Sequence, residues 1–503
     1  MTGDSLKSPP ERHLFFPHVF SPRALWALLP LALVSLLYVP SLKSAYLLDD
    51  FAWLSLRNTM ANGHSLLWAL FSPQAQGTIR PLGERTWFLL ASSWFGLNPV
   101  PFHLLALGTQ FLNLLMVMIV GRRLTGSTAA GIVAAALWTI NDVLVEPLVW
   151  ASAFNEVLHT FLFLVAFYSF LRWISLRSIS SRRPLWLVLH IAAFILALGA
   201  LELAVTLPAV AAVYVLLTDK SRWKTVLPSA AISLGFVTLH LVAIRLPAQG
   251  PYQLTLDWGV LANLAHFWAL ILGPQEYART HQANPLLMNL ATLTVTAMIL
   301  GWTVRASYRK RWLPVFFLFW FLITLAPTLP FLGHQTSYYA FLPSIGIAWL
   351  AGDAITRVAS WPGRTAAIAC AIVYAVCQIP STIFVRDWNQ DRARGTVERE
   401  LLLRKAVHDI RQVQPAGPVF LSGIDWEQFW WGMCYGQLTR EGLRDIHLLP
   451  DAAAHGVAIP PKEWCLTPDF QFSSEEFFGL LRSGQAAVYD ITKSPPLRLS
   501  SPK

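Results

Sequence analysis

A series of long apolar segments limits what this chain can fold into more than any other feature of its sequence. The first, residues 24–40 (ALWALLPLALVSLLYVP), carries no charge and approaches the roughly 20 apolar residues that cross the ~30 Å hydrocarbon layer of a membrane. Further segments, each ended by glycine, proline or charge, lie at about 102–120, 128–146, 157–171, 185–200, 204–217, 225–244, 286–303, 312–330, 338–352 and 365–383. The sequence therefore predicts about eleven transmembrane helices.

The composition agrees with a chain that lies mostly in a bilayer. Hydrophobic residues make up 55% of the sequence, charged residues 13%, and the mean hydropathy is +0.48, values that do not suit a water-soluble globule. The net charge of +10 largely reflects basic loops on one side of the membrane. Because no basic and aromatic module typical of nucleic-acid binding is visible, we expect a lipid bilayer as partner and no nucleic acid.

The loops between the apolar segments predict an orientation. Lysine and arginine collect in alternate loops, as is typical of the cytoplasmic side. These residues are Arg122, Arg123, Arg172, Arg177, Arg182, Arg183, Lys220, Arg222, Lys224, Arg305, Arg309, Lys310 and Arg311. The opposite turns, near 147–156, 201–203 and 331–337, contain neither residue type. We therefore expect the N-terminus in the cytoplasm and the C-terminus outside.

Two apolar segments allow more than one interpretation. Residues 258–275 (WGVLANLAHFWALILGPQ) are apolar, but a crossing there would invert every later loop, so we expect an external interfacial or re-entrant helix. Residues 24–40 could also belong to a signal peptide. Since Pro40 and the bulky Tyr46 make a poor cleavage site, an uncleaved helix is favoured.

The sequence changes character after residue 384, where charged residues become frequent and apolar stretches shorten. GPVFLSG and AAVYDIT read as buried strands and 396–411 as a helix, which indicates a small α/β domain. The expected fold is an all-α polytopic membrane protein with this domain at its C-terminus. We expect a cytoplasmic segment at 1–23 and a membrane domain at 24–383, whose first external loop is 41–101. An extracytoplasmic domain would follow at 384–503. An external location would permit a disulfide between Cys434 and Cys465, with two buried free thiols as the alternative.

Carboxylates recur where the apolar segments end on the predicted external side. Asp49 and Asp50 lie just past the first segment, and Glu146, Glu156 and Glu202 lie at two later external turns. Acids are nearly absent from the membrane-embedded segments, an arrangement expected of a site built at the interface. The alternative for the acidic pair is structural, because both side chains could cap the short helix that begins DFAWLSL.

Several short motifs follow one another along the chain. They are DD (49–50), RPL (80–82), FGLNPVPFHLLAL (95–107), GRRLTGS (121–127), VEPLVWASAFNE (145–156), LELAVTLP (201–208) and YYAFLPSIG (338–346). In this order and spacing they resemble the multi-span glycosyltransferases of the GT-C fold that use polyprenyl-phosphate sugars. The resemblance is to the membrane part of the transmembrane-and-tetratricopeptide O-mannosyltransferases and their bacterial relatives, and it covers about residues 46–350.

The resemblance implies a catalytic base in the first external loop. Such a carboxylate takes the proton of the acceptor hydroxyl while its oxygen attacks the anomeric carbon; we expect Asp49 to be this base and Asp50 to cap or orient. The donor would be a polyprenyl-phosphate-linked sugar, whose phosphate is neutralised by basic side chains. Substrate-binding candidates are Arg80, His103, Glu146, Trp150, Glu156, Glu202, His334 and Tyr339. As alternatives, Arg80 could anchor the loop at lipid headgroups, and His103 could bond within the bundle.

Three basic residues of the usual site are missing. Relatives tend to read W-x-S-G-R-x-D where this chain has WASAFNE, SKE where it has ALE, and RYLYLP where it has YYAFLP, so that Phe154 and Tyr338 stand in place of arginine. Either other cations replace them, or the phosphate is held differently, or activity is lost. The candidate replacements are Arg80, Arg85, Arg245, Arg279 and His334. The C-terminal domain also lacks a tetratricopeptide period, so the acceptor need not follow the family's.

We therefore expect an inverting hexosyltransferase of the GT-C type on the outer face of a bacterial inner membrane. The acceptor is left open among protein hydroxyls, lipids and glycans; no cofactor is assigned, and a divalent metal is left open. A lipid-linked glycan polymerase or ligase is the nearest alternative. A transporter or flippase would normally place polar groups near the bilayer midplane, and a scaffold would use the soluble domain as its working part.

WEQFWWGM at 426–433 could offer a sugar-stacking or membrane-touching surface.

Overall fold

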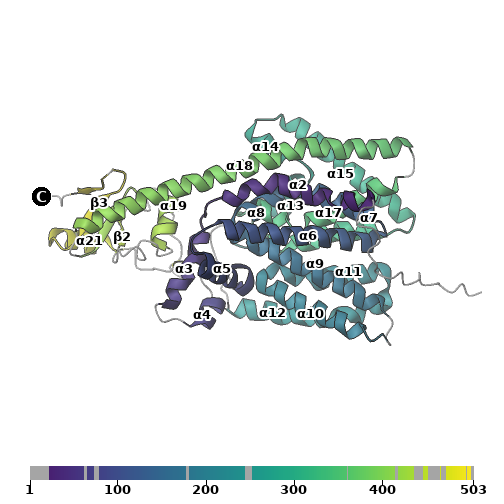
Figure 1. The fold of residues 1–503 in the computed structure, drawn as a ribbon, viewed down its shortest axis with the longest axis horizontal. Helices are drawn as coiled ribbons and strands as arrows, with labels where there is room; N and C mark the ends of the chain where they lie inside the picture. The colour runs from purple at the N-terminus through teal and green to yellow at the C-terminus, as the bar shows by residue number, and fades with distance from the viewer. Residues whose placement is uncertain are drawn as a thin grey trace, which may run out of the picture.

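The computed structural model describes residues 22–61, 65–72, 79–176, 180–243, 252–358, 361–413, 417–434, 446–450, 465, 472–493 and 495–499. Within these residues the chain is mostly helical, and a small sheet follows the helices near the C-terminus (Figure 1). The expected fold class, a helical polytopic membrane protein with a small C-terminal α/β domain, is confirmed.

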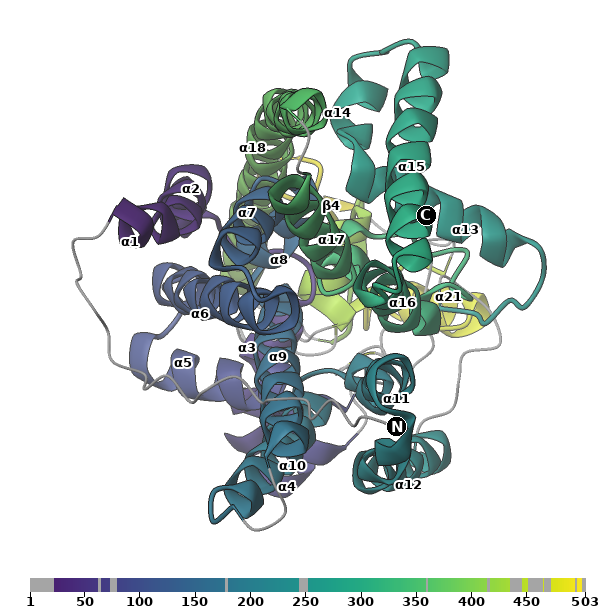
Figure 2. The same ribbon diagram turned by 90° about the vertical axis from the view of Figure 1, so that its right-hand side faces the viewer.

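The helices of the membrane part form a bundle with a buried centre. In chain order they are α1 (Pro22–Ala27), α2 (Leu29–Tyr38), α3 (Asp50–Ala61), α4 (Leu66–Phe71), α5 (Trp87–Phe95), α6 (Val100–Thr125), α7 (Thr128–Thr139), α8 (Val145–Val149), α9 (Phe154–Ser175), α10 (Arg183–Ala200), α11 (Leu207–Thr218), α12 (Leu227–Ala243), α13 (Gly259–Leu272), α14 (Gln275–Thr280), α15 (Pro285–Tyr308), α16 (Leu313–Leu325), α17 (Ser344–Arg357) and α18 (Trp361–Val413). Figure 2 shows α6, α9 and α17 near the middle, with α1, α12 and α15 at the edge. Burial agrees with this arrangement. In the apolar 18-residue stretch that contains α9, 67% of the residues are buried, whereas in that of α15 only 6% are. The outer helices therefore face lipid.

The predicted membrane segments form helices of different lengths. Seven helices among the described residues are long and apolar enough to cross a membrane, or eight if α7 and the helical segment after it, bent by 70°, count as one span. The predicted segments overlap helices, but α11, α16 and α17 have only 12, 13 and 14 residues, or roughly 20 Å at 1.5 Å per residue. Their predicted length is partly taken up by 3₁₀ turns at Glu202–Thr206 and Ala326–Thr328. By length and apolar composition alone, seven or eight of the predicted segments reach a full span among the described residues, and the remaining apolar helices are shorter.

Basic residues of the predicted cytoplasmic loops come together at the end of α6. Arg311 and Arg357 both pair with Asp353, with N–O distances of 2.9 and 2.6 Å. Arg357 also donates to the carbonyl of Thr125, the last residue of α6. The ends of α6, α15 and α17 therefore meet, as the predicted orientation requires if α13 does not cross. With 14 residues, α13 is itself short for a span.

The end of α2 is hydrogen-bonded to α18. Tyr38 at the end of α2 is buried, and the carbonyl of Leu37 accepts a hydrogen bond of 2.7 Å from Arg386 Nη1 of α18. The carbonyl of Pro40 accepts another, of 2.9 Å, from Gln390 Nε2. These contacts tie α2 to α18.

The C-terminal domain is built on a continuation of the last apolar helix. Helix α18 has 53 residues and runs through the predicted boundary at 384 (light green in Figure 1). The strands β1 (Val419–Ser422), β2 (Ile446–Leu448), β3 (Ala487–Asp490) and β4 (Leu497–Leu499) form a sheet in the order β2-β1-β3-β4, with β4 antiparallel to β3 and the other pairs parallel. The two strands predicted from the sequence are β1 and β3, the buried central pair. Helix α21 (Ser474–Arg482) packs Phe477 against Phe420.

Cys434 and Cys465 are joined by a disulfide, whereas Cys370 and Cys377 are free. We expect denatured, unreduced protein to take up a maleimide at the two free thiols only, because a disulfide sulfur does not react. Intact-mass measurement should show two added labels before reduction and four after it. Four labels without reduction, in protein isolated under thiol-blocking conditions, would remove the bond.

Candidate active site

The acidic pair follows a sharp turn of the chain at Leu48. This residue has a φ of +40°, in a region that non-glycine residues adopt rarely and only where surrounding contacts impose it. The preceding residue is fixed on both sides: Leu47 N donates to Asp50 Oδ2 at 2.8 Å, and the Leu47 carbonyl accepts from Trp150 Nε1 at 3.2 Å. The turn directs the side chains of Asp49 and Asp50 to different places.

Asp50 is fully buried, and both of its carboxylate oxygens accept hydrogen bonds. Besides the bond from Leu47 N, its Oδ1 accepts from Ser152 N at 2.6 Å and from Ser152 Oγ at 2.5 Å. Burial raises the pKa of Asp50 to about 7, although these hydrogen bonds act in the opposite direction. The side chain thus connects the start of α3 to the turn before α9.

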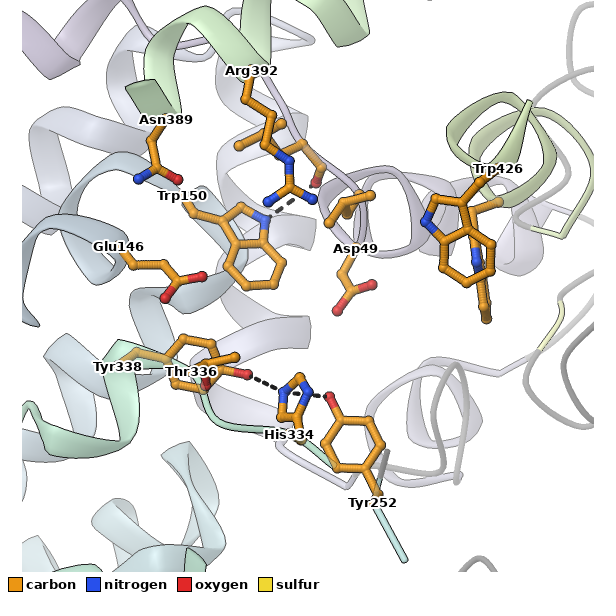
Figure 3. Close-up of a pocket in the computed structure, with 13 residues that line it drawn as sticks. Asp49, Glu146, Trp150, Tyr252, His334, Thr336, Tyr338, Asn389, Arg392 and Trp426 are labelled. Carbon is orange, nitrogen blue, oxygen red and sulfur yellow. Dashed lines mark hydrogen bonds between the residues drawn. The ribbon is translucent and has the colours of Figure 1, made fainter. Parts of the chain in front are cut away.

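Asp49 lines a cavity of about 370 Å³. The walls come from the turn after α2, from the segments around α8 and residues 334–338, and from the C-terminal part of the chain. The lining residues are Leu47, Leu48, Asp49, Glu146, Trp150, Tyr252, His334, Thr336, Tyr338, Asn389, Arg392, Trp426 and Trp430. Figure 3 shows the carboxylates of Asp49 and Glu146 pointing into this space. Sequence positions more than 300 residues apart therefore meet at one site.

A histidine and two tyrosines form one hydrogen-bonded edge of the cavity. His334 Nε2 lies 2.9 Å from Tyr338 Oη and 3.2 Å from Tyr252 Oη. Burial lowers the pKa of His334 to about 4, so its ring is neutral at pH 7. Glu146 accepts a hydrogen bond of 2.9 Å from Ser337 Oγ on the same segment. This edge offers hydroxyl and carboxylate groups of the kind that bind sugar hydroxyls.

Arg80 lies in a cluster of ion pairs near the cavity. Its Nε and Nη2 donate to the two carboxylate oxygens of Glu202 at 2.7 and 2.6 Å, and its Nη1 donates to Glu84 Oε1 at 2.6 Å. Asn155 Nδ2 donates to the same Glu84 oxygen at 3.1 Å. The guanidinium fork is therefore engaged bidentately by Glu202. The cluster ties the segment before α5 to the turns before α9 and α11.

Three further predicted residues lie outside the cavity wall. Glu156 is buried on α9, next to the ion-pair cluster. His103 is buried with its Nε2 3.1 Å from the carbonyl oxygen of Ser44, which corresponds to the alternative of a bond within the bundle. Tyr339 is buried, and its neighbour Tyr338 lines the cavity instead.

The candidate replacement cations are scattered. Arg85 is fully buried, and its Nη1 donates to backbone carbonyls at the end of α4. Arg279 on α14 is largely exposed and pairs with Glu276 at 2.6 Å. Arg245 and, from the basic loops, Arg177 lie outside the described residues. None of the described candidate arginines lines the cavity.

Sequence analysis missed the groups that α18 brings to the site. Asn389 and Arg392 lie beyond the predicted domain boundary, three residues apart and therefore on one face of the helix. Both line the cavity, and Trp426 of the expected aromatic surface reaches it from α19 (Trp426–Gln428). The sequence DWNQDRARG could have indicated this. It follows the last apolar segment with no helix-breaking residue before its glycine, so the helix could be expected to continue.

The cavity brings together groups with different chemical capacities. The carboxylate of Asp49 can accept a proton, the guanidinium of Arg392 can hold an anion, and the rings of Trp150 and Trp426 can stack on a sugar face. In the part of the chain that the structure describes, no group of three or more His, Cys, Asp or Glu side chains is close enough to hold a metal ion.

No protein-family model and no curated protein matches the sequence. Among solved structures, the chain is similar to ArnT from Cupriavidus metallidurans bound to undecaprenyl phosphate, with 18% identity, 93% of each chain covered and a TM-score of 0.48. It is similar to the apo state of that protein at 15% identity, again with 93% of each chain covered, and a TM-score of 0.49. It is also similar to the archaeal oligosaccharyltransferase AglB from Archaeoglobus fulgidus in complex with an inhibitory peptide and a dolichol-phosphate, with 11% identity, 93% of this chain and 68% of that chain covered, and a TM-score of 0.45.

Proposed function

We propose that the protein is a membrane glycosyltransferase that moves a sugar from a polyprenyl-phosphate donor to an acceptor hydroxyl, with Asp49 as the general base. The proposal rests on the different positions of the two acids. Asp49 lines the cavity, whereas both carboxylate oxygens of Asp50 accept hydrogen bonds from Leu47 and Ser152. The resemblance of the sequence motifs to GT-C glycosyltransferases supports the same assignment.

The reaction is a single displacement at the anomeric carbon. The acceptor oxygen forms a bond to this carbon while its proton passes to the Asp49 carboxylate. The bond between the anomeric carbon and the phosphate oxygen breaks, and the lipid phosphate leaves with the electron pair. Because attack and departure take place on opposite faces of the sugar, the anomeric configuration inverts.

The other lining residues would bind the sugar. Trp150 and Trp426 offer aromatic faces for stacking, and Tyr338, Tyr252 and Glu146 offer groups for hydrogen bonds to hydroxyls. The arrangement favours an enzyme over a transporter, since the polar groups gather where helices end, and not at a central break.

Sugar transfer in membranes tests the proposal. Membranes that contain the protein are supplied with polyprenyl-phosphate hexoses carrying a radioactive sugar, and the label is followed into protein, lipid and glycan fractions. We expect transfer from at least one hexose donor, with release of polyprenyl phosphate in equal amount. Label that crosses the membrane while still attached to the lipid would indicate a flippase instead.

The same proposal places the active site on the external face. A reporter fused after residue 390 should be active only outside the cytoplasm, and one fused near 178 only inside, because the basic loops stay on the cytoplasmic side. Paired alkaline phosphatase and green fluorescent protein fusions measure this directly. If the fusion after residue 390 fluoresces in the cytoplasm, residues 258–275 cross the membrane and the C-terminal domain lies on the cytoplasmic side.

A further inference from the structure

We propose that Arg392, on the helix that leads into the C-terminal domain, binds the phosphate of the lipid donor and so replaces the basic residues missing from the motifs. This assignment rests on the proposed function. It makes α18 part of the active site, so that the cavity is complete only when the last membrane helix continues outward into the domain.

Two acidic side chains and one arginine set the charge of the cavity. Asp49 and Glu146 both point into it (Figure 3) and by themselves would repel a phosphate. Among the described lining residues Arg392 is the one arginine or lysine. Its charge is close enough to act on Glu146. An anion bound in this cavity therefore has its counter-charge at Arg392.

The other candidate cations are engaged elsewhere. The fork of Arg80 is held bidentately by Glu202 and also contacts Glu84. Arg85 donates to backbone carbonyls. His334 is at the cavity but neutral at pH 7, because burial lowers its pKa to about 4. An arginine offers a phosphate a permanent positive charge. Among these groups, Arg392 is the one whose charge faces the cavity.

The arginines along α18 also differ in where they point. Arg386 pairs with Asp387 at 2.7 Å, and Arg394 pairs with Asp391 at 2.9 Å. The guanidinium of Arg392, between them in sequence, extends into the cavity toward Trp150 (Figure 3). The helix thus presents Arg392 to the site, whereas Arg386 is bonded to Asp387 and to the Leu37 carbonyl and Arg394 is paired with Asp391.

The position along the helix suits a lipid phosphate. Arg386 is the first charged residue after the last apolar segment, and Arg392 follows six residues later, or about 9 Å along a helix. The headgroup layer adds about 5–8 Å to each side of the hydrocarbon core. A donor with its chain in the bilayer would therefore present its phosphate near the level of Arg392.

Binding of undecaprenyl phosphate, compared with uncharged undecaprenol, tests the assignment. Both lipids are titrated into the full-length protein in detergent micelles and quantified by native mass spectrometry. We expect Arg392→Gln to weaken undecaprenyl phosphate at least tenfold and to leave undecaprenol unchanged, and Arg392→Lys to retain part of the preference for phosphate. Arg394→Gln, two residues away and exposed, should bind both lipids as the unmodified protein does.

The outcomes separate this assignment from the proposed function. If the unmodified protein prefers the phosphate lipid and Arg392→Gln keeps the same preference, Arg392 is not the phosphate ligand, while the glycosyltransferase proposal stands. If the unmodified protein shows no preference for the phosphate lipid, the proposed donor and this assignment both fall. If Arg392→Gln does not fold, Arg392→Met, which also removes the charge, takes its place, and a preference for the phosphate lipid equal to that of Arg394→Gln would overturn the assignment.

Discussion

Replacing Asp49 by asparagine should lower the rate of sugar transfer by roughly 100-fold or more, the usual contribution of a general base. The amide keeps the size of the side chain but cannot take up the acceptor proton. Since Asp49 acts on the acceptor and not on the lipid phosphate, donor affinity should hardly change. The rate of transfer and the KM for the donor, measured in membranes with equal amounts of inserted protein, show both effects.

Two matched variants make this result specific. Asp50→Asn should act more mildly, at a cost near ~1 kcal/mol, because this side chain holds the turn and does not line the cavity. Asp391→Asn, on the exposed face of α18, should transfer sugar normally. If Asp49→Asn works at the unmodified rate in correctly inserted protein, the acidic pair is structural and the mechanism assigned to it must be withdrawn.

The membrane architecture was readable from the sequence because each span must hide its backbone in one helix and cover it with apolar side chains. The lengths of the helices were less readable, since hydropathy does not show where a helix gives way to a 3₁₀ turn, as it does at Glu202–Thr206 before α11. The central strands β1 and β3 were predicted correctly because both are short apolar runs between turn residues.

The candidate site was only partly readable. Carboxylates at successive helix ends on one side of the bundle meet wherever the helices pack side by side, and Asp49 and Glu146 do so. The ion pair of Arg80 with Glu202 joins residues 122 positions apart, a pairing that no local pattern reveals. Arg392 was missed because a change in composition at 384 suggested a new domain, whereas the helix continues. Composition reports the solvent around a segment, not whether its backbone is interrupted.

Replacing Arg80 by methionine should destabilise the fold by roughly 3 kcal/mol, near the lower end of the range for breaking a buried ion pair. The Arg80 side chain keeps 20% of its exposure, while Glu84 keeps 4% and Glu202 31%. Without the guanidinium, two carboxylates are left facing each other in a poorly solvated place. Thermal unfolding of the purified protein in detergent micelles should show a midpoint lower by several degrees.

A double variant shows whether the loss comes from unpaired charge. Arg80→Met combined with Glu202→Gln should regain part of the stability, because Glu84 keeps the hydrogen bond from Asn155 and the second orphaned carboxylate is gone. Arg279→Met, which removes a surface ion pair with Glu276, should change the midpoint little. If Arg80→Met instead unfolds normally but binds undecaprenyl phosphate at least tenfold more weakly, Arg80 is the phosphate ligand. The donor would then lie on the side of the cavity toward α11, and the role assigned to Arg392 would pass to Arg80.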